Sequence, residues 1–172
     1  MVNVPMHRKI TKKKFELLLR DLKSAIQSFY GRRLVAVVVF GSVGRGTPRS
    51  DSDVDLLIVA DPLPPGRMRR VDEFAAVKKA LANRIKVLEE CGIFTRLSPV
   101  FKTPAEVHRG SLLFLDMIED GRTLIDVSDF WRRYLREFRR RLNRLGARKI
   151  YEGDSWYWDL KPDYRPGEVF EI

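Results

Sequence analysis

Two aspartates spaced two residues apart, Asp53 and Asp55, have the types and spacing that most directly predict chemistry in this sequence. The apolar run that follows them predicts a β-strand. Side chains alternate across a strand, so both carboxylates should point to one face, with their Cα atoms about 6.5–7 Å apart. One or two Mg²⁺ ions could be held between them, because magnesium favours a few carboxylates combined with substrate phosphates. The pair therefore predicts a metal site.

A Gly-Ser pair lies upstream of the aspartates, directly after an apolar run at 34–40. Gly41 has no Cβ, so the backbone there can approach a ligand closely. If a helix begins near Ser42, its free N–H groups and the Ser42 hydroxyl face an anion. The segment predicts strand, tight turn, short helical turn, loop and second strand. A phosphate cradle beside metal ligands is suited to metal-assisted chemistry on a nucleoside triphosphate.

The complete pattern is G-S-x-x-R-G, five residues, then S-D-x-D-L, and its fixed positions are Gly41, Ser42, Arg45, Gly46, Ser52, Asp53, Asp55 and Leu56. It resembles the signature of the DNA polymerase beta-like nucleotidyltransferase superfamily, and most of all the minimal, antitoxin-type nucleotidyltransferase branch of prokaryotes. The resemblance implies that the glycines and serines of the pattern, helped by Arg45, bind the nucleotide. It implies that Asp53 and Asp55 bind the divalent metals and are the catalytic residues.

The same resemblance implies a reaction: transfer of a nucleoside monophosphate, AMP from ATP, to an unidentified acceptor with Mg²⁺ and release of pyrophosphate. Members of the superfamily usually carry a third acidic residue on the strand after the intervening helix. The strand expected at 93–101 has no Asp or Glu, and Arg96 or Ser98 occupies the matching face. Glu106 and Asp116 could substitute only if the fold brings them close. We therefore expect nucleotide binding with slow transfer.

Two other functions stay open at this point. Members of the minimal branch are often paired with a helical toxin of the HEPN type, which implies a partner-binding antitoxin with weak or no transferase activity. The other is an RNA-binding module. Four arginines recur every four residues near the C-terminus: Arg132, Arg136, Arg140 and Arg144. This stripe predicts contact with an acidic protein or RNA, although a solvated helix face would show the same spacing.

Other glycine- and aspartate-rich motifs fit the segment poorly. A phosphate-binding loop of the G-x-x-x-x-G-K type requires lysine where Thr47 stands, and the glycines do not match G-x-G-x-x-G. An EF-hand starting at Asp51 would need Gly and Glu where Leu56 and Pro62 stand. An ordinary turn is also rich in Gly, Ser and Asp. It leaves unexplained why acidic residues lead into an apolar strand, where they are costly unless they face a cleft or a metal.

Composition limits the class of protein. A chain of 172 residues predicts one domain with an extension, and a net charge of +10 favours acidic partners such as nucleotides, RNA or an acidic protein face. A single cysteine, Cys91, excludes an internal disulfide framework and a cysteine-rich zinc site. The N-terminal segment has no apolar signal core, and no apolar stretch reaches membrane-spanning length. We expect no membrane association and a cytoplasmic location.

The periodicity of the chain predicts an α/β (α+β) fold, in which a small mixed sheet holds the site and helices pack on one side of it. Helices are expected at 11–30, after a loose arm, at 68–90, and at 128–147; Pro99 predicts that the strand at 93–101 lies at a sheet edge. Residues 1–127 would form the nucleotidyltransferase domain with its N-terminal helix. Residues 128–172 would form a basic helix and an irregular aromatic tail packed on the same domain.

Overall fold

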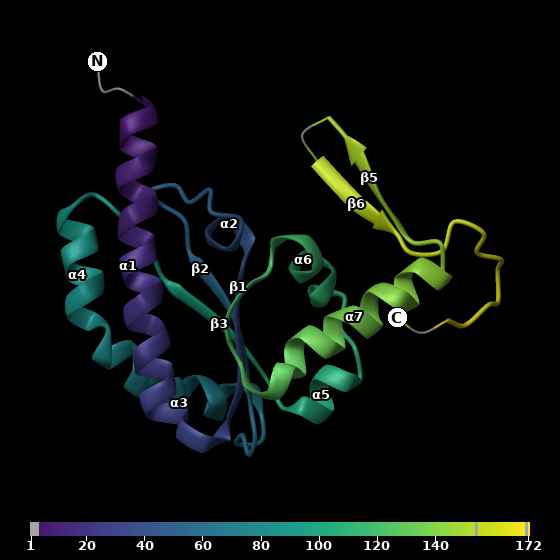
Figure 1. The fold of residues 1–172 in the computed structure, drawn as a ribbon, viewed down its shortest axis with the longest axis horizontal. Helices are drawn as coiled ribbons and strands as arrows, with labels where there is room; N and C mark the ends of the chain where they lie inside the picture. Colours follow the sequence, from purple (N-terminus) through teal and green to yellow (C-terminus); the bar gives the residue numbers. More distant parts are fainter. Residues whose placement is uncertain (1–3, 154, 171) are drawn as a thin grey trace. The chain divides into compact units, whose positions relative to one another are not determined.

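A four-stranded mixed sheet forms the centre of the N-terminal part of the chain (Figure 1). The computed structural model describes residues 4–153, 155–170 and 172, so the parts of the predicted arm and tail at 1–3, 154 and 171 lie outside the described residues. The strands are β1 (Leu34–Phe40), β2 (Val54–Ala60), β3 (Leu97–Lys102) and β4 (Arg122–Asp126), in the order β3-β2-β1-β4. The predicted α/β class with a mixed sheet is confirmed.

The pairing of the strands places β3 at one edge. β1 is antiparallel to both β2 and β4, and β2 is parallel to β3. Pro99 lies on β3, as expected for a residue that cannot donate to a central ladder. The register sets Phe40 opposite Asp55, and Asp55 opposite Ser98. The last residue of β1 and the first residues of β2 therefore meet at the same end of the sheet.

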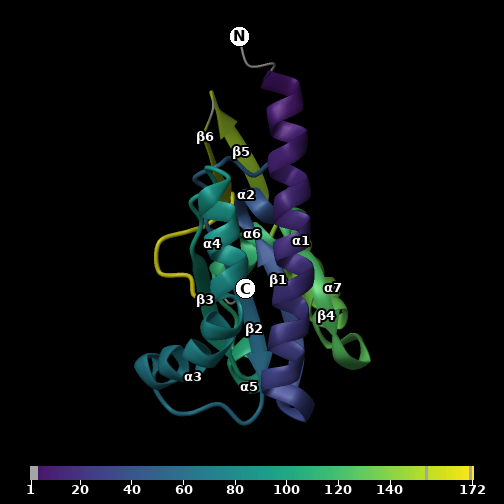
Figure 2. The same cartoon turned by 90° about the vertical axis from the view of Figure 1, so that its left-hand side faces the viewer.

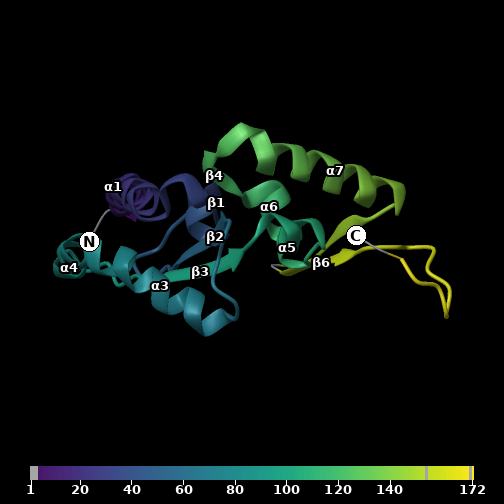
Figure 3. The same ribbon diagram turned by 90° about the horizontal axis from the view of Figure 1, so that it is seen from below.

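Helices cover both faces of the sheet, whereas the sequence predicted one (Figures 2 and 3). On one side lie α1 (Val4–Tyr30), α3 (Arg67–Ala80) and α4 (Ala82–Glu90), and on the other α5 (Pro104–His108) and α6 (Leu113–Asp120). The first group shares a core with alternate strand residues such as Val37 and Leu56. Val38 and Leu57, which alternate with these, are also fully buried. Strands that are apolar at successive positions require cover on both faces.

Several helix bounds differ from the sequence prediction. α1 begins at Val4, not at Thr11, and Pro5 is compatible with that start because proline is tolerated in the first turn of a helix. The single helix expected at 68–90 is two helices that meet at Leu81, whose N–H is shared between the carbonyls of Val77 and Lys78. None of the helices in the described part of the chain combines the length and apolar composition that a membrane crossing requires.

The C-terminal residues form a second compact unit, Trp131–Ile172, separate from Met1–Phe130. Its helix α7 (Phe130–Arg144) carries a row of stacked rings, Trp131, Tyr134 and Phe138. The tail is not wholly irregular, because β5 (Arg148–Glu152) and β6 (Ser155–Asp159) form an antiparallel hairpin. Aromatic residues have a high strand propensity, so Trp156, Tyr157 and Trp158 on β6 suit a two-stranded ribbon. The predicted division at 127/128, and the packing of the second part on the first, remain predictions.

Candidate functional site

Gly41 and Asp55 are brought together by the strand register. Gly41 follows Phe40, the residue opposite Asp55, and opens the single helical turn α2 (Gly41–Gly44) with φ +66°. A Cβ built on Gly41 would lie 2.6 Å from Oδ2 of Asp55. The sequence predicted that the missing Cβ makes room for a ligand. In the structure it makes room for a carboxylate of the chain itself.

This contact predicts that Gly41→Ala costs more than its backbone conformation alone. An L-residue at positive φ costs about 1–2 kcal/mol, and Gly31, at φ +52° with nothing within 4 Å of a built Cβ, provides the matched control. We expect Gly41→Ala to lower the free energy of unfolding further than Gly31→Ala and, unlike the control, to weaken ATP binding. Urea denaturation and calorimetry measure the two effects. Equal losses for the two variants would contradict the contact.

Asp53 is held by the backbone of Arg96, the residue immediately before β3. Its Oδ1 accepts a hydrogen bond from the N–H of Arg96 at 3.0 Å, and the N–H of Val54 donates to the carbonyl of Arg96 at 2.8 Å. Asp53 thus lies immediately before β2 rather than on it, because the ladder begins at Val54. This backbone clamp fixes the position of its carboxylate beside that of Asp55.

The carboxylate of Asp55 is the electrostatically unusual group of the site. Burial raises its pKa above the ordinary value, the nearby charge of Asp53 raises it further, and a hydrogen bond from Ser98 opposes both. No ion pair of Asp53 or Asp55 with Lys or Arg occurs among the described residues. Two adjacent carboxylates without a cationic side chain leave negative charge that a divalent cation can neutralise.

A chain of hydrogen bonds ties the glycine turn to the loop that carries the aspartates. The hydroxyl of Ser42 donates to Oγ of Ser52 at 3.0 Å, and the N–H of Arg49 donates to the same oxygen at 2.9 Å. The N–H of Thr47 donates to the carbonyl of Ser42 at 2.9 Å, which folds the loop back onto the turn. Ser42 and Ser52, the two serines of the sequence pattern, therefore lie side by side.

Arg45, predicted to help hold phosphates, points to another partner in the structure. Its Nη1 donates to Oδ2 of Asp120 at 2.7 Å, at the end of α6. A Cβ on Gly44 would lie 2.6 Å from the carbonyl oxygen of Asp120 and 2.7 Å from that of Val39. Gly44 and Asp120 thus fix α6 against the turn. Sequence reasoning missed both, since Asp120 is remote in the chain and nothing distinguishes Gly44 from an ordinary turn glycine.

The position expected for a third carboxylate is occupied by Ser98, which pairs with Asp55 and hydrogen bonds to it. Glu106 does not substitute. Lys102 pairs with Val59, so β3 carries the chain about 13 Å from Asp55 before α5 begins. Asp116 lies on α6, but no group of three His, Cys, Asp or Glu suited to a metal is found among the described residues.

Glu106 has a structural role instead. Arg70 donates to both of its carboxylate oxygens, at 2.7 and 3.0 Å, and the carboxylate also closes the capping box of α5 with Thr103. The hydrogen bonds from Arg70, assisted by the backbone of Thr103, lower the pKa of Glu106 from 4.5 to about 2. A depressed carboxylate pKa stabilises the fold above the unfolded-state pKa, and this contribution disappears as the pH falls towards the folded-state value.

We therefore expect Glu106→Gln to lower the free energy of unfolding by about 1–3 kcal/mol at pH 7, the usual range for charged hydrogen bonds. The difference from the wild type should shrink as the pH falls from 4.5 to about 2. Mg²⁺-dependent ATP binding should not change. Urea titrations at several pH values, together with calorimetry at pH 7, measure both. Loss of ATP binding in a folded Glu106→Gln protein would place Glu106 in the site after all.

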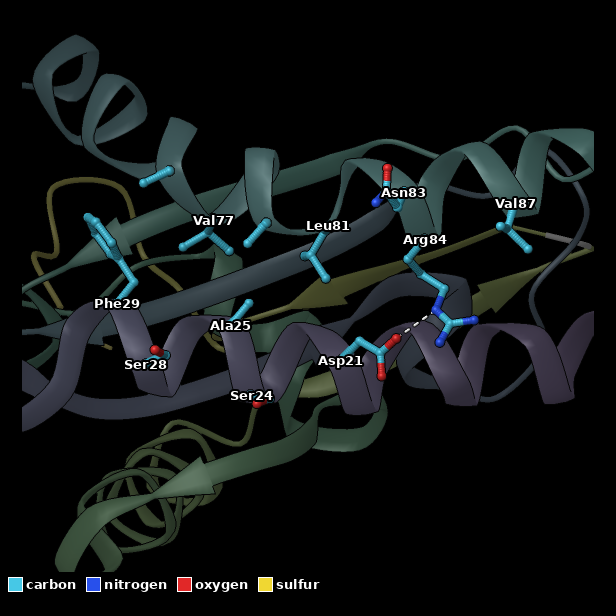
Figure 4. Close-up of a pocket in the computed structure, with 12 residues that line it drawn as sticks. Asp21, Ser24, Ala25, Ser28, Phe29, Val77, Leu81, Asn83, Arg84 and Val87 are labelled. Atoms are coloured by element: carbon cyan, nitrogen blue, oxygen red, sulfur yellow. Dashed lines mark hydrogen bonds and ion pairs between the residues drawn. The ribbon is translucent and has the colours of Figure 1, made fainter.

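A separate groove of about 930 Å³ lies between α1 and the helices α3 and α4 (Figure 4). Nε of Arg84 contacts Oδ2 of Asp21 across it at 2.6 Å, and small side chains such as Ala25 and Ala80 line the rest. Neither aspartate of the site lines it. Asp55 and Leu57 lie on one face of the sheet. Leu56 lies on the opposite face, where it packs with α1 and α3. The groove is therefore distinct from the candidate site.

Comparisons with known proteins agree with this geometry. The model of the nucleotidyltransferase domain family matches residues 19–111. "Putative protein adenylyltransferase MJ1305" of Methanocaldococcus jannaschii is 26% identical over 141 residues, which are 81% of this chain and 90% of that protein. "Putative protein adenylyltransferase MJ0604" of the same organism is 37% identical over 46 residues, 27% of this chain and 46% of that protein.

Among solved structures, a crystal structure of a toxin–antitoxin with AMP-PNP is similar, at 15% identity and a TM-score of 0.44, over 72% of this chain and 92% of that one. A likeness at this level adds nothing to the assignment, which depends on the family model and its match to more than half of the chain. The pattern from Gly41 to Leu56 lies inside the matched residues. The chain belongs to the nucleotidyltransferase domain family.

Proposed function

We propose that this nucleotidyltransferase moves AMP from ATP to a hydroxyl group of a protein, in a Mg²⁺-dependent reaction. The observation that carries the proposal is the contact between Asp55 and Gly41, since a built Cβ at Gly41 would lie 2.6 Å from Oδ2 of Asp55. It joins a carboxylate pair suited to a cation with a turn suited to phosphates. The adenylyl group and the protein acceptor are taken from the name of the relative that aligns with 81% of this chain.

The residues fit a magnesium ion that is shared with the substrate. Asp53 and Asp55 provide two neighbouring carboxylates, and burial together with the charge of Asp53 raises the pKa of Asp55, as expected where negative charge is concentrated for binding a cation. Two protein carboxylates are enough, because magnesium completes its shell with water and substrate phosphates. When bound, the ion would neutralise charge on the phosphates and on the leaving group.

The remaining roles belong to the chain. Gly41 and Ser42 would hold the phosphates through the N–H groups of the turn, and the Ser42 hydroxyl, which donates to Ser52 at 3.0 Å, would fix this turn to the loop that carries the aspartates. In the reaction the acceptor oxygen forms a bond to the α-phosphorus, the bond to the bridging oxygen of pyrophosphate breaks, and the acceptor proton passes to solvent. Ser98, not a carboxylate, faces Asp55, so no side chain is positioned as the base there. A general base accelerates such a step by about 10²–10⁴-fold, and transfer should accordingly be slow.

The arginine stripe is the proposed contact surface for the acceptor protein. α7 carries seven arginines and one glutamate, and Arg132, Arg136, Arg140 and Arg144 are exposed. Like charges four residues apart destabilise a helix, so the large excess of arginine on α7 is explained better by an acidic partner than by helix stability. An acidic face on the acceptor fits this surface. Binding to RNA in place of protein is an alternative outcome of the test below.

The test uses ATP labelled at either the α- or the γ-phosphate, Mg²⁺ and cell lysate. We expect a protein band labelled from α-labelled ATP but not from γ-labelled ATP, and no band with the Asp53→Asn/Asp55→Asn protein. Exchange of the four stripe arginines for glutamine should weaken labelling and reduce its sensitivity to salt. Label from the γ-phosphate would indicate phosphoryl transfer. Label in RNA would identify a different acceptor, and a partner that co-purifies without nucleotide or label would favour an antitoxin-type binding protein.

A further inference from the structure

Lys12 of α1 lies against the loop that follows the glycine turn. A Cβ built on Gly46 would lie 3.2 Å from Nζ and 3.6 Å from Cε of Lys12. Gly46 has φ +73°, and its N–H donates to the carbonyl of Val43 at 3.1 Å. The N-terminal half of α1 runs past α2 in both Figure 1 and Figure 2. The ammonium group thus lies beside Gly46, whose N–H is bonded to the same short turn that contains Ser42.

The charge of Lys12 is not committed to a carboxylate. Its charge helps to lower the pKa of Glu16, but Arg122 holds that carboxylate with its two terminal nitrogens, Nη1 and Nη2, the second at 2.7 Å. The other cations at this loop have acidic partners, Asp120 for Arg45 and Asp51 for Arg49. Among the side chains that the structure describes, at residues 9–153, 155–170 and 172, none forms an ion pair or a hydrogen bond with the side chain of Lys12.

The loop therefore has an acidic end and a cationic end. Gly41, at its start, contacts Asp55, and Gly46, five residues later, contacts Lys12. A polyphosphate laid along the turn would have one end beside the carboxylates and the other beside the ammonium group. Lysine suits the second position, since it offers a compact charge on a flexible stem and binds phosphate as a point charge.

We infer that Lys12 binds the β- or γ-phosphate of the nucleotide, on the side of the pyrophosphate that leaves. The inference rests on the proposed function of the same site. It assigns a phosphate-binding cation to the turn, whose own arginines, Arg45 and Arg49, are paired with Asp120 and Asp51. Lys12 precedes residues 19–111, the range that the family model matches, so the family assignment does not include it.

Calorimetry with ATP, pyrophosphate and AMP, each with Mg²⁺, tests the inference on the full chain. For Lys12→Met we expect about tenfold weaker binding of ATP and pyrophosphate, the effect of one lost charged hydrogen bond. AMP binding should not change, because AMP lacks both distal phosphates. Lys12→Arg should restore most of the affinity. Lys23→Met, an exposed lysine on the same helix, is the matched control and should bind all three ligands like the wild type.

Each outcome decides between the two proposals. Equal ATP affinity of the wild type and Lys12→Met would overturn the role of Lys12 and leave the proposed function intact. An equal loss for ATP and AMP would also overturn it, since the side chain would then support the fold or the nucleoside. If the wild type bound no ATP, the proposed function and this inference would both be wrong. A cooperative thermal unfolding transition of Lys12→Met and of Lys23→Met is the check that each variant is folded.

Discussion

The Asp53→Asn/Asp55→Asn protein is expected to lose Mg²⁺-dependent ATP binding and to transfer label at least about 10³-fold more slowly than the wild type. The stabilisation of transition-state charge by a bound metal amounts to several kcal/mol, and each 1.36 kcal/mol is a factor of ten in rate. Each single variant should weaken binding as well, because one remaining carboxylate neutralises less of the ion. Calorimetry with ATP, with and without Mg²⁺, and single-turnover labelling provide the two measurements.

Asp51→Asn is the matched control for this experiment. Asp51 has the same side chain, lies two residues before Asp53, and pairs only loosely with Arg49 at 3.7 Å on the surface. Its replacement should leave binding and transfer unchanged. The apo protein adds a second readout, since ionisation of a carboxylate whose pKa is raised by burial disfavours folding above that pKa. Asp55→Asn should therefore raise the Tm of the apo protein at neutral pH. ATP binding by the Asp53→Asn/Asp55→Asn protein at the wild-type affinity would exclude the proposed site.

The second large effect is expected from Ser98→Asp, as a gain of rate. Ser98 pairs with Asp55 across the parallel β2–β3 ladder, so a carboxylate there would join the other two at one end of the sheet. General-base assistance is worth about 10²–10⁴-fold, and we expect single-turnover transfer to rise by about 10²-fold at saturating Mg²⁺ and ATP.

Ser98→Asn controls for size and hydrogen bonding without adding charge, and it should not accelerate transfer. The prediction is contradicted if Ser98→Asp binds Mg²⁺ and ATP but transfers label at the wild-type rate. Fast single-turnover transfer by the wild-type protein alone would also contradict it. That result would show that Asp53 and Asp55 suffice without a third carboxylate.

The sequence was informative where function depends on residues close together in the chain. β1 has the bounds predicted from its apolar run, and the order of strand, helical turn, loop and strand from Leu34 to Ala60 is as expected. The capping box at Thr103 and the edge position of Pro99 also agree with local rules. In each case the prediction depends only on residues that are close together in the chain, because their types determine which local backbone conformations are favourable.

Long-range features could not be predicted in the same way. Lys12 reaches Gly46 from a helix that precedes β1 and β2, and Arg45 is paired with Asp120, which lies 75 residues later in the chain. No periodicity encodes either contact. The sequence around Leu81, where α3 ends and α4 begins, contains no Pro or Gly that would predict a break in the helix. The tail hairpin is not predicted because Gly, Pro and Asp are common in irregular chain, although Gly153, at φ +58°, lies in the hairpin turn.

The pairing of Phe40 with Asp55 also bears on the order in which the site assembles. Fifteen residues separate these two positions, whereas forty-three separate Asp55 from Ser98. Closing the longer loop costs about 0.9 kcal/mol more chain entropy, and contacts of high sequence separation form late in folding. The glycine turn and both aspartates can therefore meet in a β1–β2 hairpin before β3 arrives. The hydrogen bond from Ser98, which lowers the pKa of Asp55, is then the part of the site that forms last.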